Sequence, residues 1–326
     1  MLSKKMNRRD ALGVIGGASL GLLCPQASHA AQLIRIGYQL TLASAIDVIA
    51  IEEKLYEKAN LKIAAHKFDA GRGVRDAMIA GAIDVGGMAV VPFIVGAAQR
   101  EMVAIAVSSF FGGTILVQVK PGSAIKRMED LRGKKIGTAV GSLVHSVFVE
   151  RVATAFGLKK GDYEIVNIGF GNLIPALIAG TVDAVTALDP HAGLAEYEKL
   201  ARTLVSYEKF DLSPNLLVVR AAFLQENEIE IVNALKPWLD AVKMFHNDKG
   251  RVAGIINREY ERQGYKLPDP VIRQGLARLR VEPEITNEVR KYLFEMADLL
   301  KGNKQISSVP DWSQVLRPDL LRKAQG

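Results

Sequence analysis

Residues 130–148 read DLRGKKIGTAVGSLVHSVF and join a strand pattern to a helix pattern through two small residues. The apolar run 136–140 predicts a short buried strand, and the apolar residues after Ser142 recur at helical spacing. A helix that begins at Gly141 and Ser142 has first-turn N–H groups without internal partners. These groups and the helix dipole favour an anion beyond the carboxyl end of the strand. We therefore expect a ligand contact here, although Ser142 can instead cap its own helix.

Short apolar runs alternate with helical patterns along most of the chain. The runs expected to form strands are 33–38, 61–68, 83–88, 103–110, 115–121, 134–140, 163–169, 182–188, 201–207 and 215–224. The expected helices include 43–59, 73–82, 143–157 and 172–180, and a helical, polar region follows residue 225. This order predicts an α/β protein with parallel strands and crossover helices, arranged in two lobes with a C-terminal helical tail.

The two expected lobes are discontinuous in sequence: the first comprises 31–118 and 219–326, and the second comprises 119–218. An internal repeat supports related lobes, because 75–88 and 174–188 share the pattern Ala-x-Ile-Ala-Gly-x-x-Asp. In each copy the glycine ends a short helix and can adopt the left-handed conformation at little steric cost. The same pattern can also arise at an ordinary turn from a helix into a strand.

The first thirty residues have the features of an export signal. A positive region precedes the apolar run 11–24, and Ser28 and Ala30 are the small residues of a cleavage site. Arg8 and Arg9 resemble the paired arginines of twin-arginine signals. We therefore expect cleavage after Ala30 and a periplasmic location for the remaining chain.

Charge and cysteine content exclude several classes of protein. The formal net charge of +7 is spread along the chain without a basic block, so nucleic acid is not an expected partner. The single cysteine, Cys24, lies in the predicted export signal, so the exported chain has no thiol for a disulfide, a metal or a nucleophile. The histidines lack metal-ligand spacing and no complete nucleotide motif occurs, so we expect no metal and no cofactor.

A second seam, Gly71-Arg72-Gly73, repeats the strand-to-helix geometry of Gly141 and Ser142. The Arg72 guanidinium can hold a sulfonate or carboxylate through two parallel hydrogen bonds. It can equally be a solvated turn residue.

Three stretches carry a resemblance to a known family. They are MEDLRGKKIGTAVGSLVH (128–145), AFGL (155–158) and ALIAGTVDAVTALDP (176–190). These stretches resemble the solute-binding proteins of ABC importers, in the nitrate, sulfonate and taurine group with its NMT1/THI5-like members. RIGYQ (35–39) is similar to the same family in the first lobe. One departure is Leu188, where members often have a tryptophan before Asp-Pro.

The resemblance implies a two-lobed periplasmic binding protein fold of type II, which closes on a small ligand at its hinge cleft. We expect an exported, monomeric protein without catalytic activity that delivers a small organic anion to an ABC permease and its ATPase. Nitrate or a thiamine-pyrimidine precursor remains an alternative ligand. A THI5-like pyrimidine synthase is disfavoured because the exported chain lacks cysteine. A LysR-type effector domain is disfavoured by the export signal and by the absence of a DNA-binding helix-turn-helix.

The candidate ligand-binding residues lie at strand ends, at helix starts or near the expected hinge. They are Gln39, Thr41, Ser44, Arg72, Gly73, Ser109, Phe110, Gly141, Ser142, His145, Asn172 and Asp189. Several have structural alternatives: Ser44 can cap a helix, Phe110 and Phe111 can be ordinary core, and His145 can be packed away from the ligand.

Overall fold

The computed structural model describes residues 32–326, and the predicted export signal lies outside them. The strands are β1 Leu33–Gln39, β2 Lys62–Phe68, β3 Val85–Ala89, β4 Met102–Phe110, β5 Ile115–Val119, β6 Lys135–Thr138, β7 Glu164–Asn167, β8 Ala184–Leu188, β9 Arg202–Ser206 and β10 Pro214–Arg220. Within the described residues no helix is long and apolar enough to cross a membrane.

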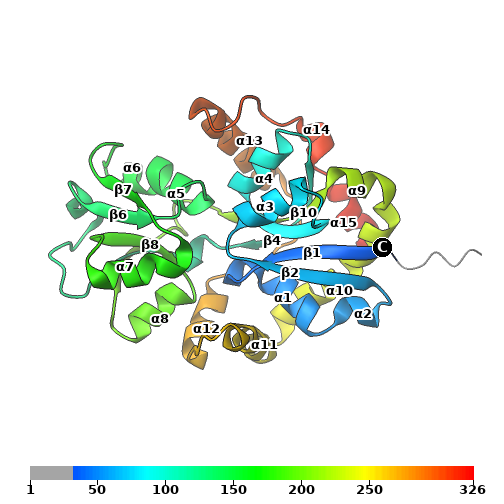
Figure 1. Ribbon diagram of the computed structural model, residues 1–326, viewed down its shortest axis with the longest axis horizontal. Coiled ribbons are helices and arrows are strands. Elements are labelled where there is room, and N and C mark those ends of the chain that lie inside the picture. The colour runs from blue at the N-terminus through cyan, green and yellow to red at the C-terminus, as the bar shows by residue number, and fades with distance from the viewer. Residues whose placement is uncertain (1–31) are drawn as a thin grey trace, which may run out of the picture. The chain divides into compact units, whose positions relative to one another are not determined.

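Helices alternate with the strands and then dominate the last hundred residues (Figure 1). They are α1 Ala45–Glu52, α2 Leu55–Lys58, α3 Gly71–Ile79, α4 Val90–Ala97, α5 Leu143–Val147, α6 Ala153–Ala155, α7 Leu173–Ala179, α8 His191–Tyr197, α9 Ala221–Glu226, α10 Glu228–Asn247, α11 Lys249–Arg262, α12 Asp269–Ala277, α13 Asn287–Gly302, α14 Trp312–Val315 and α15 Pro318–Gln325. The single helix expected over 43–59 is divided at Lys54, whose left-handed backbone (φ 52°) separates α1 from α2.

The described strands form two five-stranded sheets with equivalent orders. The first is β2-β1-β3-β10-β4 and the second is β7-β6-β8-β5-β9. In each sheet the first three strands are parallel. The second sheet consists of the consecutive strands β5 to β9, whereas the first consists of β1 to β4 and of β10, which returns to it from beyond the second sheet. Strands β10 and β5 run antiparallel to their neighbours, so the expectation of parallel strands throughout is wrong for them. Each of these strands follows a short connection from the other sheet, β5 from β4 and β10 from β9, so neither is reached through the crossover helix that parallel neighbours need.

The internal repeat is confirmed as a repeated structural unit. Gly81 and Gly180 both have a left-handed backbone, with φ of 70° and 79°. The aspartates that follow make the same pair of bonds to the strand beside them. Asp84 accepts a hydrogen bond from the backbone N–H of Arg35 at 3.1 Å, and Asp183 accepts one from that of Lys135 at 2.8 Å. Asp84 also donates its own N–H to the carbonyl of Arg35, and Asp183 donates its own to the carbonyl of Lys135, each at 2.8 Å.

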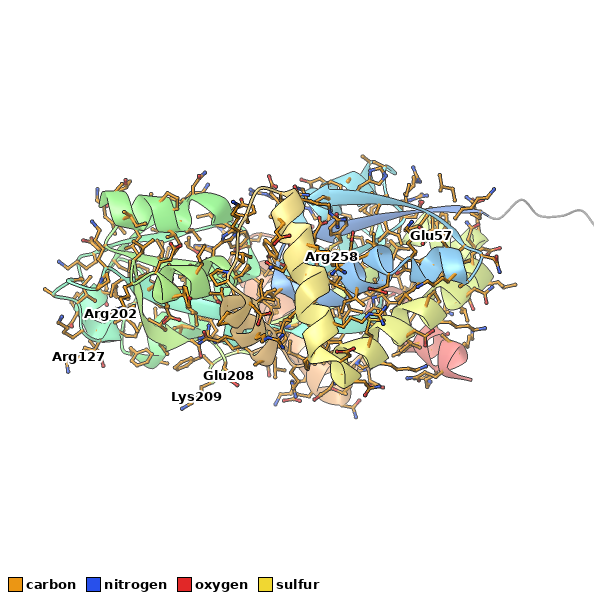
Figure 2. All side chains as sticks on the ribbon, turned by 90° about the horizontal axis from the view of Figure 1, so that it is seen from below. Glu57, Arg127, Arg202, Glu208, Lys209 and Arg258 are labelled. Atoms are coloured by element: carbon orange, nitrogen blue, oxygen red, sulfur yellow. The ribbon has the colours of Figure 1, made fainter. Side chains whose placement is uncertain are left out.

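Helices cover both faces of each sheet, which explains the apolar centre of the protein. Figure 1 shows α3 and α4 on one side of the first sheet and α1, α2 and α10 on the other. Strands β4 and β5 are buried along their whole length, as expected for strands covered on both faces. The edge strand β2 is largely exposed and carries His66 and Lys67. Charged side chains such as Arg127, Glu208 and Lys209 extend outward from the ribbon (Figure 2).

Candidate ligand-binding site

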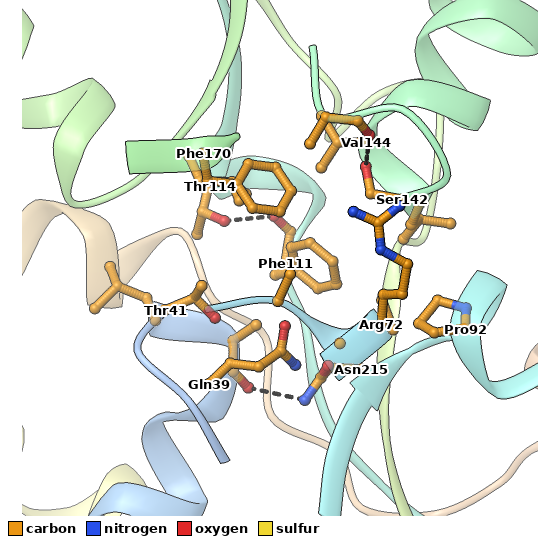
Figure 3. Close-up of a pocket in the computed structure, with 18 of the residues that line it drawn as sticks. Gln39, Thr41, Arg72, Pro92, Phe111, Thr114, Ser142, Val144, Phe170 and Asn215 are labelled. Atoms are coloured by element: carbon orange, nitrogen blue, oxygen red, sulfur yellow. Dashed lines mark hydrogen bonds between the residues drawn. The ribbon is translucent and has the colours of Figure 1, made fainter. Parts of the chain in front are cut away.

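A pocket lies where loops and helix starts of both sheets meet within the single compact unit 31–326 (Figure 3). It contains about 680 Å³ of atom-free space that opens to solvent. Its wall is formed by Gln39, Thr41, Leu42, Ala43, Ala70, Gly71, Arg72, Ala89, Pro92, Phe111, Thr114, Ala139, Val140, Gly141, Ser142, Leu143, Val144, Phe170, Leu188, Asp189 and Asn215. The mixed polar and apolar wall suits a small organic molecule.

The start of α3 forms one side of the pocket. Gly71 is packed so closely that an added Cβ would lie 3.1 Å from Cγ of Pro92 and 3.3 Å from Cβ of Met88. A larger residue would therefore push the helix start away from β3. Arg72 follows directly and is exposed to the pocket. Its guanidinium forms no ion pair with any described residue, so its charge is available for an anion.

The opposite side contains Gly141 and Ser142, which lie between β6 and α5. The expected helix start is confirmed: Ser142 is the N-cap of α5, and α5 continues through a π-helical turn at Phe148–Val152 into α6. Gly141 has φ of 81°, a backbone that strongly favours glycine. The Ser142 hydroxyl accepts from the N–H of His145 at 3.3 Å and donates to the carbonyl of Ala139 at 2.7 Å. Ser142 thus lines the pocket and also caps its helix.

The first-sheet floor of the pocket is held by polar contacts to main-chain carbonyls. Gln39 donates its side-chain N–H to the carbonyl of Gly87 at 3.0 Å. The carbonyl of Ala43 accepts from Ser109 Oγ at 2.8 Å and from Asn215 Nδ2 at 3.3 Å. These two bonds fix the short 3-10 turn Leu42–Ser44 above the sheet.

Apolar side chains form the remaining wall. Phe111, Phe170 and Leu188 line the pocket (Figure 3 labels the two rings). Phe110 does not line it; the guanidinium carbon of Arg280 stacks 4.0 Å from the centre of the Phe110 ring. In this region the aromatic side chain that lines the pocket is therefore Phe111 and not Phe110.

Asp189 lies in the pocket wall, yet its carboxylate already has partners. It pairs with Arg278 Nη1 at 2.9 Å and accepts from the N–H of Gly193 at 2.9 Å. Burial raises the pKa of Asp189, and the charge of Arg278 opposes that increase. The carboxylate thereby ties the end of β8 to the end of α12.

The structure brings half of the predicted site residues to the pocket. These are Gln39, Thr41, Arg72, Gly141, Ser142 and Asp189. The other six, Ser44, Gly73, Ser109, Phe110, His145 and Asn172, lie outside the pocket wall.

Three of the six have clear structural surroundings. Ser44 is buried, and its Oγ accepts a hydrogen bond from the backbone N–H of Gln39 at 3.4 Å. Asn172 is exposed at the start of α7. His145 is half-buried with Nδ1 unpaired among the described residues, and burial lowers its pKa.

Asn215 and Thr114 are pocket residues that the sequence analysis missed. Asn215 is the second residue of β10, in a stretch that reads as apolar, so no local pattern indicates a ligand contact there. Because β10 is antiparallel to β3, its beginning lies at the carboxyl edge of β3, where Asn215 is paired with Ala89. The described residues contain no group of three His, Cys, Asp or Glu placed to hold a metal ion.

Comparisons with known proteins identify the family. The family described as NMT1/THI5 like matches residues 43–249. A protein of Escherichia coli K12 provisionally described as an aliphatic sulfonates-binding protein is 25% identical over 96% of this chain and 98% of its own length. The taurine-binding periplasmic protein of the same organism is 25% identical over 91% of this chain and 94% of its own.

Solved structures agree on the fold. The alkanesulfonate-binding protein of Xanthomonas axonopodis pv. citri, bound to MOPS, is similar with a TM-score of 0.77 at 23% identity. That similarity covers 87% of this chain and 97% of the other. The two mixed sheets with flanking helices are thus the periplasmic binding protein fold, as predicted. The chain belongs to the NMT1/THI5-like family.

Proposed function

We propose that this protein binds a small organic anion between its two sheets and delivers it to an ABC permease. The observation that carries the proposal is the unpaired guanidinium of Arg72, which faces the helix start at Gly141 across the pocket. A cation and a helix N-terminus together favour a negatively charged group. The names of the two Escherichia coli relatives, which refer to sulfonates and taurine, support the same ligand class.

The apolar wall favours an organic anion over nitrate. Phe111, Phe170 and Leu188 offer surface that only a carbon-containing ligand would cover with a gain in free energy. A sulfonate, taurine or an aromatic acid therefore fits the wall better than an inorganic ion. The two Escherichia coli relatives are described as binding proteins, which supports binding rather than catalysis.

The binding mechanism that we propose is closure of two lobes about a hinge. The composition of the sheets, β1 to β4 with β10 and then β5 to β9, suggests lobe bounds that differ slightly from those expected from sequence: 31–110 with 214–326, and 115–206. The connections 111–114 and 207–213 would then be the hinge. A ligand stabilises the closed state because only that state provides contacts from both lobes. We further propose that the protein is exported to the periplasm and acts there as a monomer.

A ligand screen tests this function directly. Purified protein lacking residues 1–30 is heated with taurine, 1-propanesulfonate, benzenesulfonate, benzoate or nitrate, and hits are measured by calorimetry. We expect at least one organic anion to raise the melting temperature, since a ligand of the folded state stabilises it. Preferential stabilisation by nitrate would contradict the ligand class, and turnover of any compound would contradict a pure binding role.

A further inference from the structure

Two side-chain amides on the pocket floor have their orientations fixed by main-chain carbonyls. The Gln39 amide nitrogen donates to Gly87, and the Asn215 amide nitrogen donates to Ala43. Because a carbonyl can only accept, each amide must point its NH₂ group at the protein. The oxygens of both amides take no part in these bonds and can accept hydrogen bonds from another group.

Both amides belong to residues of the pocket wall. Asn215 is only 1% exposed, and its Oδ1 has no hydrogen-bond partner among the described residues. The Gln39 Oε1 atom lies 3.5 Å from the place that a Cβ would take on Gly71, a residue of the pocket wall. Figure 3 shows both side chains reaching the pocket from its lower edge. A buried acceptor without a partner is unfavourable, so the site is incomplete without a donor.

A buried carboxyl group lies behind the floor of the pocket. Asp47 is buried and accepts from Trp238 Nε1 at 3.0 Å through one oxygen, while its Oδ2 has no partner among the described residues. Gly87, which lacks a side chain, lies between this carboxyl group and the amide of Asn215. No described cation pairs with Asp47. The floor therefore offers the amide oxygens of Gln39 and Asn215, whereas Arg72 provides positive charge on the side wall.

We propose that the ligand carries an O–H or N–H donor at the end opposite its anionic group, and that Asn215 and Gln39 accept hydrogen bonds from it. This inference rests on the proposed function, because the anionic group is assigned to Arg72 and the helix start at Gly141. Asn215 and Gln39 then determine specificity: they select hydroxy- or aminoalkyl anions over plain alkyl anions of equal length.

Matched ligands separate this inference from the function itself. Calorimetry compares 2-hydroxyethanesulfonate and taurine with 1-propanesulfonate, which has nearly the same size but no terminal donor. We expect one of the donor-bearing ligands to bind about tenfold or more tightly than 1-propanesulfonate, since a site built for a hydrogen bond rejects an analogue that lacks it. Equal or tighter binding of 1-propanesulfonate would overturn the inference and leave anion binding intact. If no anion binds, both this inference and the proposed function fail.

Variants assign the preference to residues. Asn215→Leu and Gln39→Met keep the approximate side-chain volume and remove the acceptor. We expect each to reduce the preference to within about threefold, because the donor-bearing ligands lose an acceptor that 1-propanesulfonate does not use. A merely structural role would weaken all ligands equally and contradict the assignment. Gln99→Met is the control, because Gln99 also donates to a carbonyl, that of Val95, but lies on the surface. If Asn215→Leu does not fold, the ligand preference of Gln39→Met tests the assignment on its own.

Discussion

Arg72 and Gly141 approach each other across the pocket. Arg72 lies in the first turn of α3, which follows β2 of the first sheet, and Gly141 lies just before α5, which follows β6 of the second sheet. Nη1 of Arg72 lies 3.6 Å from the position that a Cβ atom would occupy on Gly141. A guanidinium and the beginning of a helix thus face the same small space. An anion placed there would contact both halves of the protein, which is the requirement for ligand-driven closure.

Removal of the Arg72 charge should weaken anion binding without unfolding the protein. We expect Arg72→Met to lower affinity about 10- to 100-fold, the usual cost of losing hydrogen bonds to a charged group. Its melting temperature should stay close to that of the wild type, because the guanidinium is exposed and forms no ion pair with a described residue. Arg75→Met on the same helix is the control, since Arg75 pairs with Asp76 and does not line the pocket. Equal affinities for both variants would remove Arg72 from the site.

Gly141→Ala should impair both stability and binding. The φ of 81° is unfavourable for alanine, and a loss of about 1 kcal/mol is expected. Gly157→Ala provides a matched control, because Gly157 has φ of 70° with nothing within 4 Å of an added Cβ. Both variants should lose similar stability in urea unfolding, but only Gly141→Ala should lose affinity. Unchanged affinity of Gly141→Ala would show that no ligand approaches this backbone.

Ser142→Ala tests the two roles of the capping serine. Loss of an N-cap is expected to cost about 1 kcal/mol of unfolding free energy. Its hydroxyl proton is already donated to Ala139, so we expect the loss of affinity to be measurable but smaller than that of Arg72→Met. Calorimetry and urea unfolding of the same sample separate the effects. A larger loss of affinity than in Arg72→Met would assign the ligand contact to the hydroxyl.

Asp47 should make folding stability depend on pH. Burial raises its pKa from 3.8 to about 7, so the unfolded chain ionises first as the pH rises. The stability contributed by the protonated group is therefore lost between about pH 4 and pH 7, with a slope of up to about 1.4 kcal/mol per pH unit.

Asp47→Asn retains an oxygen for Trp238 and cannot ionise. The wild-type minus variant difference in unfolding free energy should fall over that window and level off above it. This subtraction removes the contributions of other titrating groups. A difference that is independent of pH would refute the shifted titration.

Loss of Arg278 should destabilise the fold strongly. The variant Arg278→Met leaves the buried carboxylate of Asp189 without its cation, which typically costs about 3 kcal/mol. Arg273→Met on the same helix removes an exposed pair with Asp269 and should cost less than about 1 kcal/mol. Thermal unfolding of the two variants provides the comparison. Similar melting temperatures would mean that Asp189 is solvated or neutral without Arg278.

Local sequence patterns predicted the elements well where each pattern reports a short-range preference. The strand Lys135–Thr138, the helix start at Ser142 and the left-handed Gly180 depend on residues within one or two turns. The break at Lys54 was not predicted, because an apolar and charged pattern continues across it.

The sequence by itself determined the alternating α/β elements, the repeated helix-glycine-aspartate unit and the family, since these reside in local order and spacing. Only the tertiary structure decided that β10 joins the first sheet, that Phe111 rather than Phe110 lines the pocket, and that Asn215 contributes to its floor. The physical reason is that these features depend on pairing between segments about a hundred residues apart, as between β3 and β10. Such pairing is set by the packing of the whole core, which no local pattern records.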